Sequence, residues 1–440
     1  MTTFDGTPGR DTFDGTAAKD TAFGNGGEDF LFGLGDDDFL YGGDNRDLLN
    51  GGEGDDSLYG GSGGDTMRGG TGNDYMFDTS GQNTYYGGRG NDAVIGGIGS
   101  DRAWGGAGAD NINLNEGPGF AWGGGGDDFL SALEGQATLY GGNGADRLVS
   151  NDLGGFGLDG GDSLYGGRGN DTIEMAANGA GDNLARGGNG IDTLRLFVVG
   201  DDAGWDVNMT TGQATHTTTI NGAETVTVVD FDGIEKFTGS RGTDTIIAGQ
   251  RADTIFGGSN SEADTIYGGA GDDTITVDVV SGTAEVYGGN GRDVITTRTD
   301  GNVVAYGGGG NDTLLTSGGD DTFYGGTGND QLYGGLGDDV LFGGQSVDTV
   351  GIAGGSNTIT GGGGTDLFWF VSGLEGEVQT ITDFADGSER VEFFNGTSAV
   401  TITDDGTDTT VTFADGEGTG TIIFLGLAGG AITEADFVFG

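Results

Sequence analysis

One short pattern recurs through this chain so regularly that it must set the fold. The sequence Gly-Gly-x-Gly-x-Asp, followed two residues later by an apolar side chain, occurs sixteen times in the 440 residues. Several copies follow one another after nine residues, and six are spaced by eighteen. A fixed period of this length predicts a solenoid in which each repeat stacks on the next. The copies begin at Gly51, Gly60, Gly69, Gly87, Gly96, Gly105, Gly123, Gly141, Gly166, Gly187, Gly268, Gly288, Gly307, Gly325, Gly334 and Gly361.

Each nine-residue repeat has the composition of one turn followed by one short strand. In residues 51–59 the glycine-rich first six residues suit a tight turn, because glycine adopts backbone conformations that a Cβ forbids. The last three, Ser57, Leu58 and Tyr59, predict a strand with Leu58 pointing inward. Two repeats then make one coil of a flattened solenoid, and successive coils lie about 4.8 Å apart.

The sixth residue of each repeat is an aspartate, and stacking would place these aspartates in columns along the edges. Carboxylates this close cannot all stay charged without a counter-ion. Carboxylate and turn carbonyl oxygens form the hard-ligand set that Ca²⁺ prefers. The alternative is that each aspartate only caps its own turn. We predict that the metal ligands are Asp56, Asp65, Asp74, Asp92, Asp101, Asp110, Asp128, Asp146, Asp171, Asp192, Asp273, Asp293, Asp312, Asp330, Asp339 and Asp366.

Burial of apolar side chains is too weak to fold such a repeat alone. Ordering nine residues costs on the order of 9–18 kcal/mol, whereas burying one leucine returns about 1.5–3 kcal/mol. The formal charge of −54 adds self-repulsion to any compact state. We therefore expect metal binding to supply folding energy, and the metal-free chain to be disordered.

The repeat resembles the calcium-binding nonapeptide of RTX (hemolysin-type) proteins, over residues 4–195 and 239–369. The resemblance implies an all-β fold, a calcium-bound parallel β-roll or β-solenoid of nonapeptide repeats in two blocks with a C-terminal β cap. It also implies that each of multiple Ca²⁺ ions lies between neighbouring turns, held by aspartate carboxylates and carbonyls of the glycine turns.

Changes in the pattern divide the chain into four parts. They are a first repeat block at 1–195, a β-hairpin excursion at 196–238, a second repeat block at 239–369 and a C-terminal region at 370–440. The excursion is expected to contain strands at 196–199, 215–220 and 225–229, the last two joined by a tight turn at Asn221 and Gly222.

The C-terminal region shifts to longer alternating strands, expected at 380–384, 400–403, 409–413 and 421–425. It resembles the C-terminal region of serralysin-type RTX proteins. Its ending, residues 434–440, resembles their secretion signal, in which apolar residues follow an acidic one. The resemblance implies export by type I secretion machinery. The alternative is a sheet that simply caps the solenoid.

Composition argues against a nucleic-acid partner, disulfide bonds, a cleavable signal peptide and a membrane span. Only 16 residues are basic and the pI is near 4.1, so a nucleic-acid partner is not expected. There are no cysteines, hence no disulfide framework or thiolate metal site. Residues 1–15 lack the basic and apolar segments of a cleavable signal peptide. No apolar run approaches the length of a membrane span.

Catalytic motifs match by letter only. Residues 60–64 read Gly-x-Ser-x-Gly, but they lie inside a repeat rather than between a strand and a helix. His216 is the only histidine, so neither a zinc-protease site nor a Ser/His/Asp triad can be assembled. We expect no enzyme activity.

Aromatic residues recur with the period of the coil and should form rows on the outer faces. Examples are Tyr86, Trp104, Trp122 and Tyr140. Such rows can stack sugars or contact proteins, or they can stiffen the sheet by cross-strand packing, which is our preferred interpretation.

These observations predict a secreted, extracellular or cell-surface bacterial protein. It binds calcium, folds on Ca²⁺ outside the cell and acts without catalysis as a surface, matrix or adhesion component. The alternatives are a carbohydrate-binding adhesin that recognises cell-surface glycans through its aromatic rows, and a lattice-forming surface-layer subunit that binds other copies of itself.

Overall fold

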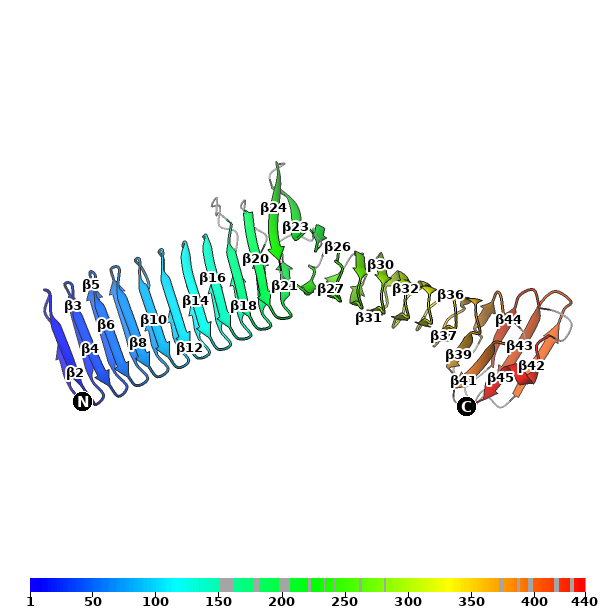
Figure 1. Ribbon diagram of the computed structural model, residues 1–440, viewed down its shortest axis with the longest axis horizontal. Coiled ribbons are helices and arrows are strands. Elements are labelled where there is room, and N and C mark those ends of the chain that lie inside the picture. Colours follow the sequence, from blue (N-terminus) through cyan, green and yellow to red (C-terminus); the bar gives the residue numbers. More distant parts are fainter. Residues whose placement is uncertain are drawn as a thin grey trace. The chain divides into compact units, whose positions relative to one another are not determined.

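The protein is all-β, and its internal contacts divide it into two compact units (Figure 1). Unit 1 comprises residues 1–201 and 212–237, and unit 2 comprises residues 202–211 and 238–440. The computed structural model describes residues 1–133, 135–150, 161–176, 182–197, 206–209, 211–220, 223–232, 234–240, 242–260, 263–280, 282–371, 376–385, 388–394, 399–414, 419–427 and 431–439. Within these ranges the helical content is one 3-10 turn, η1 (Glu434–Asp436).

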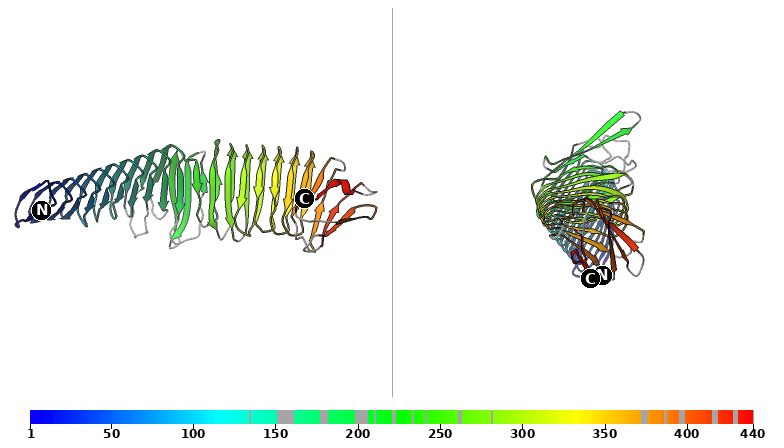
Figure 2. Two further views of the ribbon diagram at one scale, coloured as in Figure 1. Left: turned by 90° about the horizontal axis from the view of Figure 1, so that it is seen from below. Right: turned by 90° about the vertical axis from the view of Figure 1, so that its right-hand side faces the viewer.

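Each unit is a parallel β-solenoid whose successive strands alternate between two sheets (Figure 2). Within a sheet, each strand pairs in parallel with the equivalent strand of the next coil. For example, β7 (Ser57–Ser62) pairs with β9 (Tyr75–Phe77), and Leu58 lies opposite Met76. Because the step between these partners is eighteen residues, equivalent positions of the repeat stack on one another, as the period predicts.

The strands of unit 1 fall into two sheets. One contains β1 (Thr3–Asp5), β3 (Thr21–Gly26), β5 (Phe39–Asp44), β7, β9, β11 (Ala93–Ile95), β13 (Asn111–Asn113), β15 (Phe129–Ala132), β17 (Arg147–Ser150), β19 (Thr172–Ala176) and β21 (Thr193–Phe197). The other contains β2 (Thr12–Thr16), β4 (Phe30–Gly35), β6 (Leu48–Glu53), β8 (Thr66–Thr71), β10 (Thr84–Arg89), β12 (Arg102–Ala107), β14 (Gly119–Gly125), β16 (Ala137–Asn143), β18 (Ser163–Arg168), β20 (Asp182–Asn189), β23 (Gln213–Ile220) and β24 (Ala223–Asp232).

Unit 2 has the same arrangement, and β25 (Lys236–Thr238) lies at the sequence boundary between the units. One sheet contains β27 (Thr254–Asn260), β29 (Thr274–Val279), β31 (Val294–Thr297), β33 (Thr313–Leu315), β35 (Gln331–Tyr333), β37 (Thr349–Ile352), β39 (Leu367–Val371), β41 (Arg390–Phe394) and β45 (Phe437–Phe439). The other contains β22 (Asp206–Asn208), β26 (Thr245–Ile247), β28 (Thr265–Ala270), β30 (Thr283–Asn290), β32 (Asn302–Gly309), β34 (Thr322–Thr327), β36 (Val340–Gln345), β38 (Thr358–Gly363), β40 (Val378–Ile381), β42 (Ala399–Asp404), β43 (Thr409–Ala414) and β44 (Thr419–Phe424).

The core of each solenoid is a narrow stack of apolar side chains, one from each repeat. Leu40, Leu58 and Met76 of one sheet and Leu49 and Met67 of the other are completely buried. The expected inward orientation of Leu58 is therefore confirmed. The next residue along each strand points outward, because successive side chains of a strand alternate between its faces.

The hairpin excursion is present, with one difference from the expectation. Strands β23 and β24 pair antiparallel, and β24 also pairs in parallel with β20. Leu196, expected in the excursion, lies in β21, where it is buried and opposite Met175 of β19. Its buried side chain continues the solenoid core at the expected start of the excursion. Residues 198–199, Asn221 and Gly222 lie outside the described residues, and the four-part division of the chain stays a prediction.

The C-terminal strands combine parallel and antiparallel pairing. β44 is parallel to β40, β43 is antiparallel to both β42 and β44, and β45 is parallel to β41. The expected strands near 400–403, 409–413 and 421–425 are therefore present. Phe437 of β45 is buried, with its ring 6.0 Å from that of Phe393 and 6.3 Å from that of Phe424. A capping role and a secretion signal both stay predictions.

Candidate metal sites

The repeat aspartates are held in columns by hydrogen bonds between coils. The backbone N–H of Asp38 donates to Oδ1 of Asp56 at 2.7 Å, and the N–H of Asp56 donates to Oδ1 of Asp74 at 2.9 Å. The same bond recurs from Asp74 to Asp92 and from Asp92 to Asp110, at 2.8 Å in both cases. Each carboxylate thus has one oxygen fixed by the adjacent coil.

The second oxygen of these carboxylates has no such partner. Oδ2 of Asp56, Asp74, Asp92, Asp110 and Asp128 is buried and accepts no hydrogen bond. The side chains are at most 3% exposed. In Asp56, Oδ2 instead lies against the first glycine of its own turn, where an added Cβ would overlap it. Because a buried charged oxygen without a partner is costly, it requires a proton or a cation.

Carbonyl oxygens of neighbouring turns lie close to these carboxylates, since a Cβ added to Gly87 would overlap both Oδ2 of Asp92 and the carbonyl oxygen of Gly105. Gly72, the fourth residue of its turn, has φ +125°, and a Cβ there would overlap the carbonyl oxygen of Gly54 one coil earlier. The fourth position therefore favours glycine, which has no Cβ and tolerates positive φ. Its absence of a side chain lets successive turns, with their carbonyl groups, stack directly.

A turn with asparagine in the sixth position shows where the carbonyls point. Oδ1 of Asn357 accepts a hydrogen bond from the N–H of Asp339, as an aspartate of the column would. Its Nδ2, in the place of Oδ2, donates to the carbonyls of Gly354 at 2.9 Å and Gly355 at 3.3 Å, and to Oε1 of Gln379 at 2.8 Å. An aspartate in this position would present an oxygen to those acceptors, and a cation would be needed between them.

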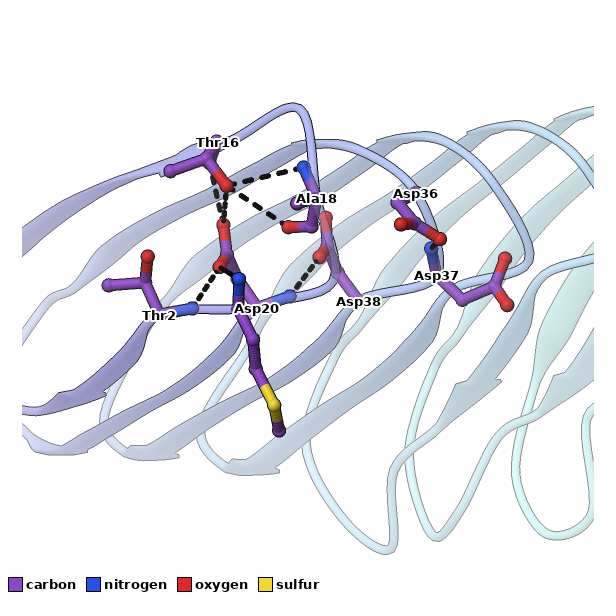
Figure 3. Close-up of polar contacts among 8 residues, drawn as sticks. Thr2, Thr16, Ala18, Asp20, Asp36, Asp37 and Asp38 are labelled. Carbon is purple, nitrogen blue, oxygen red and sulfur yellow. Dashed lines mark hydrogen bonds and ion pairs between the residues drawn. The ribbon is translucent and has the colours of Figure 1, made fainter.

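Asp20 illustrates the alternative, in which an aspartate caps its own turn (Figure 3). The Thr16 N–H donates to Oδ2 of Asp20 at 2.6 Å, and the Thr16 hydroxyl donates to the same oxygen at 2.8 Å. The Thr2 N–H donates to Oδ1. Burial opposes ionisation, but these bonds outweigh it and lower the pKa of Asp20 below its usual value. Asp20 therefore needs no cation, unlike Asp56.

Burial has the opposite net effect on the uncapped carboxylates. It raises the pKa of Asp56, Asp74, Asp110 and Asp128 to about 7, even though a backbone N–H of the adjacent coil partly offsets it. Neighbouring aspartates of the same column raise the pKa further through like-charge repulsion. These groups ionise at neutral pH only at a considerable free-energy cost unless a cation accompanies them.

The donor set fits calcium. Among the described residues no group of three or more histidine, cysteine, aspartate or glutamate side chains comes together, so side chains alone do not enclose a metal. Buried carboxylate oxygens next to turn carbonyls provide a set made only of oxygen, which suits Ca²⁺ rather than a transition metal.

The structure places all sixteen predicted ligands in four edge columns, two in each unit. Column 1 contains Asp56, Asp74, Asp92, Asp110, Asp128, Asp146, Asp171 and Asp192; column 2 contains Asp65 and Asp101; column 3 contains Asp273, Asp293, Asp312, Asp330 and Asp366; and column 4 contains Asp339. Column 2 is the patchier edge of unit 1, since Asn83, Gly119 and Ala137 occupy aspartate positions.

The sixteen predicted ligands leave out further aspartates that stand in the sixth position of a turn and have the same buried, unpartnered Oδ2. They are Asp29, Asp38, Asp47, Asp321 and Asp348. Several were hidden because their turns lack the expected glycines. Leu34 and Asp36 before Asp38, and Ser346 before Asp348, have φ of +82°, +68° and +85° in glycine positions. The detectable signal was the aspartate and its following apolar residue at the eighteen-residue spacing.

In one outer aromatic row the rings stack on one another. The rings of Tyr267, Tyr287, Tyr306, Tyr324 and Phe342 stack in sequence, with centroids 4.7–4.9 Å apart and planes within 8°. Stacking of this kind covers the faces of the inner rings, which favours cross-strand packing over sugar binding.

One aromatic side chain remains more accessible and lies in the other unit. Trp122 is 48% exposed, and its ring lies 6.4 Å from that of Tyr140 at an angle of 44°. The same sheet carries a groove of about 560 Å³ lined by Gln82, Arg102, Phe120 and Gln136, among others.

Two features were considered as catalytic in the sequence, the Gly-x-Ser-x-Gly stretch at residues 60–64 and His216. Residues 60–64 span the end of β7 and the turn that follows it, with no helix after them. His216 lies in β23 opposite Thr227 of β24. The described helices include none long and apolar enough to cross a membrane.

Comparison with protein families gives one match. The family is the RTX calcium-binding nonapeptide repeat (4 copies), which matches more than half of the chain. The matched residues are 5–40, 41–76, 77–112, 86–120, 122–152, 156–174, 238–275, 287–322, 315–350 and 353–373. No curated protein matches the chain.

Solved structures also resemble parts of the chain. A subunit of the mannuronan C5-epimerase from Azotobacter vinelandii is 26% identical, and the match covers 32% of this chain and 78% of that subunit with a TM-score of 0.18. The extracellular lipase LipA from Serratia marcescens is 16% identical, and the match covers 73% of this chain but only 40% of the lipase, with a TM-score of 0.16.

Proposed function

Because the chain belongs to the RTX calcium-binding nonapeptide repeat family, we propose that it is a secreted, non-enzymatic protein that folds on calcium outside the cell. Its calcium-loaded solenoid would act as a surface, matrix or adhesion component. Members of this family are typically secreted bacterial proteins, and calcium binding follows from the repeats themselves.

The observation that carries the proposal is the row of buried carboxylate oxygens without hydrogen-bond donors. Asp56, Asp74, Asp92, Asp110 and Asp128 form an uninterrupted stretch of column 1. Their neutralisation by cations would be coupled directly to stacking of the coils, because the same carboxylates accept the hydrogen bonds between coils. Calcium binding would then be folding free energy.

The coupling suits export of an unfolded chain. Weak sites, with dissociation constants of about 10⁻⁴–10⁻³ M, stay empty at cytosolic calcium concentrations and fill outside the cell. The described residues that resemble a secretion signal fold into unit 2, where Phe437 is buried and Oδ2 of Asp436 accepts a hydrogen bond from the N–H of Thr433. Type I secretion machinery would therefore read this end before calcium folds the chain.

Calcium titration of the full chain tests the proposal. We expect the chelated protein at neutral pH to lack strand signal in circular dichroism and to gain it as free calcium rises through 10⁻⁴–10⁻³ M. Native mass spectrometry in parallel should show multiple bound calcium ions and give the oligomeric mass. Identical spectra with chelator and with calcium would refute calcium-dependent folding.

The exposed Trp122 and a groove on the same sheet favour a second candidate, binding of surface glycans. They place an exposed indole on the same sheet as amide and guanidinium side chains, which can stack on and hydrogen-bond to a sugar. Glycan-array binding should be lost in a Trp104→Ala, Trp122→Ala double variant and kept in Trp369→Ala, a tryptophan of unit 2. Equal binding by all three proteins would remove this candidate.

A further inference from the structure

One turn of column 2 departs from the repeat at its first, second and sixth positions, and the first and sixth exchange their usual chemistry. In residues 78–83 the first position is Asp78 instead of glycine, and the sixth is Asn83 instead of aspartate. The turn therefore keeps one carboxylate but moves it from the end of the turn to its start. Asn83 still takes its place in the column, since its Oδ1 accepts from the N–H of Asp65 at 2.8 Å.

Although Asp78 stands at the start of its turn, its carboxylate lies next to that of Asp65 in column 2. Oδ2 of Asp78 and Oδ2 of Asp65 converge on the α-carbon of Gly60, where an added Cβ would overlap both. Asp78 is 1% exposed, and its other oxygen accepts from the N–H of Ser80 at 3.0 Å. Neither Oδ2 receives a hydrogen bond. Two buried carboxylate oxygens thus face each other with no donor between them.

A third buried oxygen without a hydrogen bond comes from the core on the same coil as Asp78. Tyr85 occupies the inward position of β10 and is completely buried, yet its hydroxyl makes no hydrogen bond. Asp101, Asp78, the Asn83 side chain and Asp65 all act electrostatically on this hydroxyl, so it lies near this part of column 2. Equivalent inward positions elsewhere hold apolar residues such as Met67 of the preceding coil. A tyrosine here brings an oxygen where the repeat provides none.

The turn at Asn357 shows that an asparagine in the sixth position does not create this arrangement when no carboxylate stands in the first position. There the first position is Ile352, and the amide is satisfied by two carbonyls and Gln379. At Asn83 the amide makes only a 3.4 Å contact with the carbonyl of Ser80. In column 2 the Oδ2 atoms of Asp65 and Asp78 therefore have no donor, whereas the acceptor oxygens around Asn357 are matched by its amide group.

We propose that Asp65, Asp78 and the Tyr85 hydroxyl form a cation site, with Asp78 providing the carboxylate that Asn83 lacks. The ligands are all oxygen and carry two negative charges, so a Ca²⁺ ion is the expected occupant. The inference rests on calcium binding by the repeats and adds a site where the glycine-aspartate pattern predicts none.

The first experiment counts calcium ions by native mass spectrometry of the full chain at fixed free calcium. Asp78→Asn should bind one ion fewer than the wild type, because its amide would donate to Oδ2 of Asp65 and replace the cation. The control is Asp14→Asn, an exposed carboxylate on β2 that should leave the count unchanged. Calcium-loaded circular dichroism of both variants should match the wild type.

Tyr85→Phe tests the hydroxyl separately. Loss of one ligand oxygen should raise the calcium concentration that fills this site by roughly 3- to 10-fold, without changing the count at saturation. An unchanged filling concentration would overturn the role assigned to Tyr85.

A crystal structure of the calcium-loaded chain provides a readout independent of variant folding. Density for an ion among Oδ2 of Asp65, Oδ2 of Asp78 and the Tyr85 hydroxyl would support the site. A direct contact between the two carboxyl groups with no ion, or an unchanged ion count in Asp78→Asn, would show that a shared proton holds the pair and would overturn the proposal. A wild type that binds no calcium at all would instead overturn the proposed function.

Discussion

Chelation of calcium should unfold unit 1 at pH 7.5 and leave it substantially more folded at pH 5. The reason is the raised pKa of the uncapped carboxylates in column 1. Burial raises the pKa of Asp56, Asp74, Asp110 and Asp128 from the ordinary 3.8 to about 7. Without calcium, the folded state therefore binds more protons than the unfolded state between pH 4 and pH 7. Metal-free stability must fall as the pH rises through that window.

The size of the effect follows from the difference between the two pKa values. Each pKa unit corresponds to about 1.4 kcal/mol, so one such aspartate opposes metal-free folding by about 4 kcal/mol at pH 7.5 and by about 1.6 kcal/mol at pH 5. One group thus opposes metal-free folding by roughly 2.5 kcal/mol more at pH 7.5 than at pH 5, and because the aspartates of the column repel one another their contributions do not simply add. A difference of this size at several buried carboxylates is a large fraction of the stability of a typical domain, which is about 5–15 kcal/mol.

Circular dichroism in a chelator between pH 4.5 and 8 measures this dependence directly. The strand signal should decrease as the pH rises, whereas in saturating calcium it should persist at pH 7.5, because the ion then replaces the protons. A chelated protein with full strand signal at pH 7.5, or with none at any pH, would refute the reasoning. Chloride salts at equal ionic strength control for general screening of the net charge.

Three substitutions, each paired with a control variant, test the packing of the coils in the calcium-loaded protein. Gly72→Ala should lower the melting temperature markedly, since its Cβ meets a carbonyl oxygen at positive φ, whereas Gly125→Ala has open space at its Cβ and should change the melting temperature little. Leu58→Ala should reduce the free energy of unfolding by about 2–5 kcal/mol in denaturant titration, and Ile98→Ala, which truncates a 65% exposed side chain, by less than about 0.5 kcal/mol. Tyr306→Ala removes two stacked ring pairs and should cost about 1–3 kcal/mol, unlike Tyr306→Phe; equal stability of the two Tyr306 variants would show that the ring row does not stabilise unit 2.

The sequence was sufficient to predict the solenoid because its period fixes both register and burial. A step of eighteen residues brings Leu58 opposite Met76 and places the aspartates of column 1 one above another. These relations need no knowledge of distant contacts, since every coil repeats the same local choice of turn, strand and inward side chain. The sixteen predicted ligands lie in columns for that reason.

The positions that the sequence could not resolve are those where another residue performs the task of glycine or aspartate. Leu34 adopts positive φ in a glycine position, so the turn before Asp38 was not recognised. Asp78 contributes its carboxylate to column 2 from the first position of its turn, and the convergence with Asp65 exists only in three dimensions. The end of the solenoid core near Leu196 was likewise set by packing against β19, which no local pattern indicates.

The buried side chain at the sixth position of a turn is satisfied in three ways in this protein. The turns that use each way indicate that calcium is the usual partner. Asp20 is satisfied by a threonine hydroxyl and Asn357 by its own amide donors, and both arrangements use a side chain specific to that turn. Asp56 and its neighbours in column 1 have glycine where Asp20 has Thr16, and carboxylate oxygen where Asn357 has nitrogen. A protein donor is thus absent at the same point of consecutive coils in this stretch. A mobile divalent cation can supply the missing charge at each of these points without any further side chain, which is why the central coils can remain so uniform in sequence.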